Sequence, residues 1–193
     1  MAVLPPFDVA VRPVTAAELG ASWHLGCPVG PAQLRALRVS FVGFDGVSHT
    51  GAIIVNKDVT GAVTTVFRRL YAARFPIHRM GPIAKYGGSD DRSMAADNTS
   101  GFNCRYAVAT GPKRWSVHAY GEAIDVNPIE NPYVQGAGVT PVAGRAYLDR
   151  SRYRRGMAVA GGLLVRAFAS VGWLWGDRWA ATPDYQHFSR TGG

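Results

Sequence analysis

The first clear pattern along the chain is a pair of apolar runs joined by a short polar turn. Residues 37–44 read LRVSFVGF and residues 50–55 read TGAIIV, so both runs are rich in β-branched and aromatic side chains. Such side chains favour β-strands. The Asp45-Gly46 dipeptide between the runs favours a tight hairpin turn. The pattern therefore predicts two antiparallel strands over residues 37–55.

Apolar residues recur at helical spacing in two later segments. Within residues 58–73 they stand three or four positions apart, which places them on one face of a helix. Asp58 is a suitable N-cap for this helix, and Pro76 follows its end. A second helix is predicted over residues 157–170, with Gly172 as its C-cap. The apolar face of the first helix consists of Val63, Val66, Phe67, Leu70 and Tyr71.

The rest of the chain is rich in glycine, proline and polar residues. Residues 1–36 contain five prolines and are expected to be irregular, and residues 86–104 and 128–155 are expected to be long loops. Residues 106–109 are expected to form a short strand. A chain of 193 residues is the size of one domain. We predict an α+β fold in which a small antiparallel sheet packs with a few helices and long loops.

The segment from Ser116 to Asp125 reads SVHAYGEAID and contains two good zinc ligands, the His118 imidazole and the Asp125 carboxylate. Gly121 lies between them and allows the backbone to turn. Residues 123–126 read as a strand in which Asp125 has apolar neighbours. A buried carboxylate is costly unless it is paired or bound to a metal. We therefore interpret His118 and Asp125 as metal ligands.

A second motif, DYQHF at residues 184–188, ends the patterned part of the chain and is predicted to be a strand. His187 supplies a third ligand, and two histidines with one carboxylate leave the fourth tetrahedral position of a zinc ion open. Zinc lowers the pKa of a bound water from about 16 toward about 7. Asp184 is close enough in sequence to accept that proton and pass it on as general base and acid.

The patterns SxHxxGxAxD and DxxHF, with GWLWGDRW at residues 172–179, together resemble a family of bacterial and phage zinc peptidases. This family includes D-alanyl-D-alanine carboxypeptidases, dipeptidases and L-alanyl-D-glutamate endopeptidases, which act on peptidoglycan stem peptides. The resemblance covers roughly residues 37–188 and implies a catalytic core within residues 37–193. It leaves the bond open between the endopeptidase and carboxypeptidase types. The positions that it assigns are the zinc ligands His118, Asp125 and His187 and the catalytic base Asp184.

The same resemblance implies that residues upstream of the first motif hold the peptide. Arg92 and Ser93 stand in that region, and a guanidinium can bind both oxygens of a carboxylate. The alternative for Arg92 is an ordinary surface arginine. Ser116 either contacts the substrate or caps the turn that carries His118.

The charge of the chain indicates polyanionic surroundings. The formal net charge is +8, and a basic surface attracts polyanions such as anionic cell-wall polymers. No nucleic-acid-binding motif is present. We therefore expect peptidoglycan peptides and wall polymers as partners, no nucleic acid, and a monomer. The densest basic group, which is a solvated face in the alternative view, is Arg145, Arg150, Arg152, Arg154 and Arg155.

Two further features concern compartment and class. Cys27 and Cys104 lack metal-knuckle or redox spacing, so two thiols and one disulfide both stay open, and a disulfide indicates an oxidising compartment. We expect no membrane span and see no signal peptide at the start of the chain. The resemblance implies an extracellular or cell-wall enzyme, or a cytoplasmic phage lysin released by lysis. The alternative class is a non-catalytic zinc module that binds cell walls or a protein.

Overall fold

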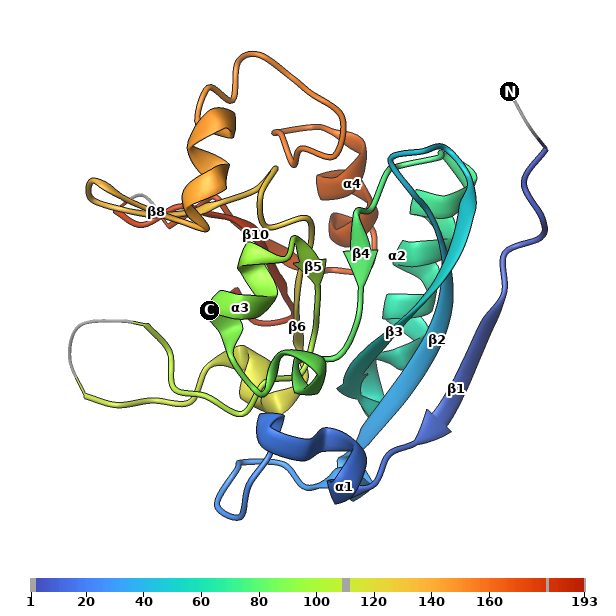
Figure 1. The fold of residues 1–193 in the computed structure, drawn as a ribbon, viewed down its shortest axis with the longest axis vertical. Helices are drawn as coiled ribbons and strands as arrows, with labels where there is room; N and C mark the ends of the chain where they lie inside the picture. The colour runs from blue at the N-terminus through green and yellow to red at the C-terminus, as the bar shows by residue number, and fades with distance from the viewer. Residues whose placement is uncertain (1–2, 109–111, 180, 193) are drawn as a thin grey trace.

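The hairpin predicted from the apolar runs is present in a computed structural model, which describes residues 3–108, 112–179 and 181–192 (Figure 1). Its strands β2 (Leu34–Val42) and β3 (Ser48–Asn56) pair antiparallel over their whole length. A third strand, β1 (Val9–Pro13), pairs with the outer edge of β2. The expectation that residues 1–36 are irregular is therefore wrong. Most side chains of β1 are exposed, so the strand has no buried face for the sequence to reveal.

Short helices connect β1 to the hairpin. The helix α1 (Ala16–Leu19) begins with a capping box, in which Thr15 and Glu18 satisfy each other's backbone N–H groups. Leu19 at its end is fully buried and belongs to a small core cluster under this segment. Two 3₁₀ turns follow, η1 (Gly20–Ser22) and η2 (Pro31–Gln33).

The first predicted helix is confirmed as α2 (Thr60–Ala72), and its predicted apolar face is buried. It starts later than expected because a 3₁₀ turn, η3 (Lys57–Val59), precedes it. The side chain of Asn56, and not that of Asp58, caps this turn by accepting the Asp58 N–H at 3.2 Å. The helix packs on β2, on the face that holds the main core.

The second predicted helix is shorter than expected. It is α4 (Leu163–Ala169), which packs against α2 and β9. Gly161 has a φ of +67° and Gly162 is the N-cap, so the helix cannot extend back to Met157. Gly172, at φ +80°, ends this segment as predicted.

A second, antiparallel sheet contains the strands that carry the two motifs. The strand β10 (Asp184–Ser189) pairs with β6 (Ala123–Asp125) and β7 (Tyr133–Gln135) and also with β9 (Leu174–Gly176). The strand β7 pairs in turn with β8 (Gly138–Thr140). His187 is opposite Asp125 in the β6–β10 register. The predicted α+β fold is confirmed, although the chain forms more than one small sheet, and this second sheet carries two of the three candidate ligands, Asp125 and His187.

Both predicted loops contain secondary structure. Residues 128–155 hold the β7–β8 hairpin and η6 (Val142–Tyr147). The Arg150 guanidinium ties this excursion together by donating to the carbonyl oxygens of Glu130, Tyr147 and Ala158 and to the Asn131 side chain. Elsewhere the elements are η4 (Ile83–Tyr86), α3 (Asp90–Ala95), η5 (Val117–Tyr120), and β4 (Arg79–Met80) paired in parallel with β5 (Asn98–Thr99).

Two remaining sequence expectations have clear outcomes. Cys27 and Cys104 form a disulfide, which decides between the two alternatives left open above. Tyr106 makes a single β-bridge to Trp115 in place of the expected short strand, and residue 109 lies outside the described residues. Within the described part of the chain, no helix is long and apolar enough to cross a membrane.

Candidate metal centre

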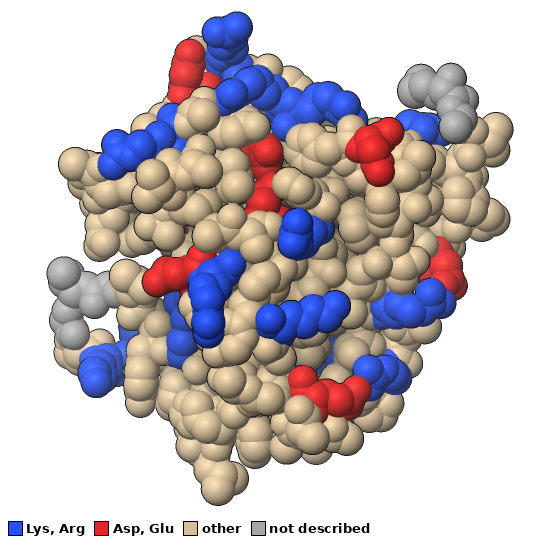
Figure 2. Space-filling view, in the orientation of Figure 1, with Lys and Arg blue, Asp and Glu red and all other residues tan. Residues whose placement is uncertain are grey.

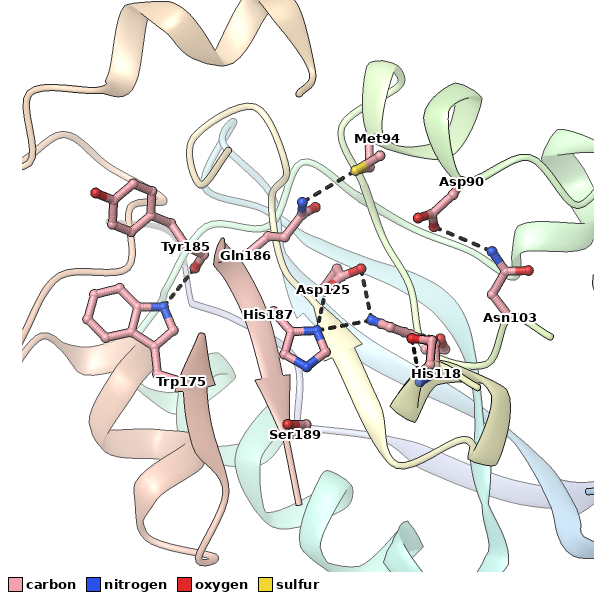
Figure 3. A network of polar contacts seen from close by, with 12 residues as sticks. Asp90, Met94, Asn103, His118, Asp125, Trp175, Tyr185, Gln186, His187 and Ser189 are labelled. Carbon is pink, nitrogen blue, oxygen red and sulfur yellow. Dashed lines mark hydrogen bonds and ion pairs between the residues drawn. The ribbon is translucent and has the colours of Figure 1, made fainter. Parts of the chain in front are cut away.

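Three buried side chains meet where β6 and β10 pair (Figure 3). His118 comes from η5, Asp125 from the end of β6, and His187 from the facing position of β10. The Asp125 carboxylate lies 3.1 Å from His118 Nε2 and 3.3 Å from His187 Nδ1. The two imidazole nitrogens are 3.2 Å apart. The structure therefore brings together the three ligands that the sequence predicts.

The backbone around His118 fixes which of its nitrogens faces the centre. Nδ1 lies 2.7 Å from the Gly101 carbonyl oxygen, so Nδ1 carries the proton and donates it there. Nε2 is then unprotonated and can bind a metal. Ser116 is the N-cap of η5, and its hydroxyl accepts the His118 N–H at 3.3 Å. Gly121, at φ +70°, ends the turn and leads into β6.

The packing behind β10 holds His187 in place. Its neighbour Phe188 points to the opposite face of the strand, is fully buried, and stacks on Phe168 of α4 with ring centroids 4.1 Å apart. The ring of Trp179 packs against the His187 imidazole, with ring centroids 5.0 Å apart. The core thus anchors the strand on one face, while the other face presents the imidazole to the centre.

The electrostatics of the cluster favour a cation. Burial alone raises the pKa of Asp125, but His118 and His187 outweigh it and hold that pKa well below its usual range. Burial lowers the pKa of His118, yet Asp125 reverses this and leaves it raised, whereas burial keeps the pKa of His187 below its usual value. Two imidazole nitrogens and a carboxylate, all within 4.8 Å of one another, are a donor set that suits zinc.

Asp184 lies at the start of β10, three residues before His187. Its Oδ1 is buried and makes no hydrogen bond to any described residue. Burial, and then the charge of Asp125, raises the pKa of Asp184 to about 8. A shielded carboxyl with an open lone pair and a raised pKa is suited to exchange protons with a molecule that enters the site.

These groups line a cavity with a volume of about 740 Å³. The metal ligands and Asp184 share this cavity with residues from four other parts of the fold. The walls include Asp90, Asp91 and Met94 of α3, Arg105 and Trp115 of the segment before η5, Tyr133 and Thr140 of the β7–β8 hairpin, and Trp179. A cleft of this size accommodates a short peptide.

A known protein family matches the part of the chain that contains the candidate ligands. Residues 110–190 match the family model described as D-alanyl-D-alanine carboxypeptidase. This is a family of zinc peptidases, M15, so the resemblance seen in the two motifs is confirmed over these residues. The match includes all three candidate ligands and Asp184. No curated protein and no solved structure gives a significant match.

In this cleft, the predicted substrate residues fall in different places. Ser116 lines the cavity. Arg92 and Ser93 are not among the described residues that line it: Arg92 is exposed and reaches the Gly87 carbonyl, whereas Ser93 is buried and accepts a hydrogen bond from Asn98. The structure therefore does not bring Arg92 and Ser93 to the metal centre.

Two other arginines upstream of the first motif, Arg105 and Arg114, line the cavity in place of Arg92, and Arg105 has the more defined contacts. It lines the cavity, forms an ion pair with Asp90 at 2.9 Å, and is about one quarter exposed. Its buried Nε makes no hydrogen bond within the described part of the chain. Sequence reasoning missed this residue, although Arg105 stands nearer to Ser116 in the chain than Arg92 does.

Proposed function

We propose that this chain is a zinc-dependent peptidase that hydrolyses a peptide bond in the stem peptide of bacterial peptidoglycan. The observation that carries the proposal is the presence of Asp184 in the same cavity as His118, Asp125 and His187. A purely structural metal site has no use for a shielded carboxyl with an open acceptor atom. The family match supports the peptidase class, and the peptidoglycan substrate rests on it.

The reaction divides between the metal and the protein. A zinc ion held by the three ligands would supply Lewis acidity that polarises the scissile carbonyl and acidifies water. The Asp184 carboxylate accepts the proton of the attacking water as the new C–O bond forms. It then gives that proton to the leaving nitrogen as the C–N bond breaks. His118 keeps the tautomer needed for binding because Gly101 holds its Nδ1 proton.

Arg105 can recognise a chemical group that both candidate bonds share. In both candidate bonds, D-alanyl-D-alanine and L-alanyl-D-glutamate, the residue that leaves as the amine carries a free carboxylate. The guanidinium of Arg105 lines the cleft and can pair with that carboxylate. We therefore propose that a free carboxylate on the leaving residue is part of what the site recognises, whichever of the two bonds is cut.

The proposal is tested by digestion of purified peptidoglycan and of defined stem peptides, with products identified by mass spectrometry. Cleavage is expected in the presence of zinc, with none after chelation and recovery on zinc readdition. Asp184→Ala is expected to keep zinc and lose activity by orders of magnitude. Asp58→Asn, an exposed carboxylate on η3, is the matched control that keeps both. Zinc binding without hydrolysis by the unmodified protein would instead identify a non-catalytic zinc module.

Surface charge and the disulfide support action at the cell wall. Figure 2 shows Lys and Arg side chains gathered along one edge of the drawn face, where Figure 1 places the segment around residues 140–160. Such an edge would attract anionic wall polymers. A disulfide between Cys27 and Cys104 is suited to an oxidising compartment outside the cytoplasm. A phage lysin released by lysis acts in the same surroundings.

A further inference from the structure

Arg105 follows directly after one half of the disulfide. The Cys104 sulfur is bonded to Cys27, and the Cys104 backbone N–H donates to the Ser22 carbonyl at 3.0 Å. Both partners belong to the N-terminal segment that runs from η1 through a solvent-exposed turn, in which Leu25 is almost fully exposed. The residue before Arg105 is therefore fastened to a surface segment, and the disulfide is the covalent part of that fastening.

The other contacts of Arg105 come from the cleft side. Asp90, in the first turn of α3, pairs with its guanidinium at 2.9 Å and also accepts the Asn103 side-chain amide at 3.4 Å. The Arg105 carbonyl accepts the Ser116 N–H at 3.0 Å, which joins Arg105 to the turn that carries His118. The Arg105 side chain is thus held by α3, while its backbone joins the disulfide-fastened segment to the turn that carries His118.

Between Arg105 and Ser116, the described residues 106–108 and 112–115 extend away from the body of the protein as the two sides of an arm (Figure 1). Tyr106 and Trp115 stack at its base with ring centroids 4.2 Å apart, and the Ala107 backbone N–H donates a hydrogen bond to the Arg114 carbonyl. On one side of this base the chain continues into η5 and the core. On the other side it continues through Cys104, so release of the disulfide would loosen the segment that contains Arg105 more than the segment that contains Ser116.

We propose that the Cys27–Cys104 disulfide is a positioning element for Arg105, and that the capture of a substrate carboxylate depends on it. This inference rests on the proposed function, and within it on the role of Arg105. A guanidinium that is already in place loses less rotational freedom when a carboxylate binds than one on a loose strand. The disulfide therefore affects KM, whereas the metal ligands and Asp184 determine kcat.

Kinetics on two matched substrates test this. The double variant Cys27→Ser with Cys104→Ser is compared with the unmodified enzyme on a stem peptide with a free carboxylate and on its amide. We expect KM for the acid to rise on the order of tenfold, which is less than the roughly hundredfold cost that a misplacement of about 1 Å can have. KM for the amide, kcat and zinc content stay unchanged. An equal rise of KM for both substrates would overturn the proposal.

A double-mutant cycle separates positioning from stability. In an Arg105→Ala background, removal of the disulfide is expected to have no further effect on KM for the acid, because the group that it positions is gone. Additive effects in the cycle would show that the disulfide acts elsewhere. If Arg105→Ala itself leaves KM unchanged, both the substrate role of Arg105 and this inference fail. An effect of Arg105 without coupling overturns the inference alone.

Two further measurements keep the inference testable if the serine variant folds poorly. Reduction of the folded enzyme with a phosphine in zinc-supplemented buffer should raise KM for the acid, and reoxidation should restore it. The Arg105 Nε–H signal in the ¹⁵N NMR spectrum, assigned from Arg105→Ala, reports the side chain without any turnover. It should be sharp in the oxidised protein and move to the solvent-exposed arginine position after reduction; an unchanged signal would contradict positioning.

Discussion

Replacement of Gly121 by alanine should disrupt the metal centre without touching a ligand. Gly121 has a φ of +70°, and a Cβ at this position would lie 2.6 Å from the Asn56 backbone nitrogen and 3.0 Å from Leu34 Cδ2. The left-handed conformation costs a non-glycine residue about 1–2 kcal/mol. Overlap with packed atoms costs a further 1–3 kcal/mol or so. Together these give a loss of about 2–5 kcal/mol in the free energy of unfolding.

The same overlap should reach the ligands. The Gly121 carbonyl accepts the Asn56 N–H at 2.8 Å, and the Asn56 side chain donates to the Tyr120 carbonyl at 3.0 Å. These bonds hold the turn that carries His118 against the end of β3. A Cβ that pushes this turn away from β3 also moves the start of β6, which leads to Asp125, so zinc affinity should fall together with stability.

Gly136→Ala is the matched control, because Gly136 also has a positive φ, +57°, but its Cβ would meet no atom within 4 Å. Urea unfolding of the metal-free variants measures the stability loss, which should be about 1–2 kcal/mol for the control. Competition with a chromophoric chelator measures zinc affinity, which the control should keep. Equal losses of stability in the two variants would refute the packing argument, since backbone conformation alone would then account for both.

Three other predictions concern charge and metal. Burial, and then Asp97, raises the pKa of Glu130 to about 8, so the folded protein keeps a proton there that the unfolded chain loses above its usual pKa. The contribution of Glu130 to stability should therefore fall as pH rises between about 5 and 8, by up to 1.4 kcal/mol or so per pH unit. Because the raised pKa of Asp184 acts over the same pH range, Glu130→Gln should reduce the fall in urea titrations without abolishing it, and an identical pH dependence would contradict the reasoning. His187→Ala should abolish stoichiometric zinc binding in metal analysis, while His78→Ala, which alters an exposed histidine outside the centre, should retain it; zinc retention by His187→Ala would exclude that ligand. Binding to purified cell walls in a pull-down should weaken steeply as salt rises, and salt-independent binding would count against an electrostatic origin.

Local pattern was enough to predict the elements nearest the hairpin and the metal. The β2–β3 pair and α2 follow from apolar spacing, because each buries one face against the same core. The motif residues could also be assigned in advance, since the patterns SxHxxGxAxD and DxxHF occur together and resemble those of a zinc peptidase family. Their meeting at 3.1–3.3 Å depends on the register that places His187 opposite Asp125.

The features that escaped prediction depend on contacts distant in sequence. The strand β1 exists because β2 has a free edge, not because its own side chains alternate. Residues 128–155 look like a loop in the sequence because they have no hydrophobic pattern. Their structure is instead held by Arg150 and by main-chain hydrogen bonds. Arg105 could not be preferred over Arg92 until the position of α3 was known, since its ion pair with Asp90 spans two segments.

The candidate ligands come from two segments that are far apart in the chain, one with η5 and β6 and the other with β10, and β6 and β10 are joined by only three residue pairs. A bound ion would act as a cross-link between them, so its binding free energy would also be folding free energy. At a thousandfold excess over its dissociation constant, such an ion adds about 4 kcal/mol of stability. Resistance to proteolysis would then follow the free zinc concentration, so the zinc content of the surroundings would determine how long the protein survives as well as whether it is active.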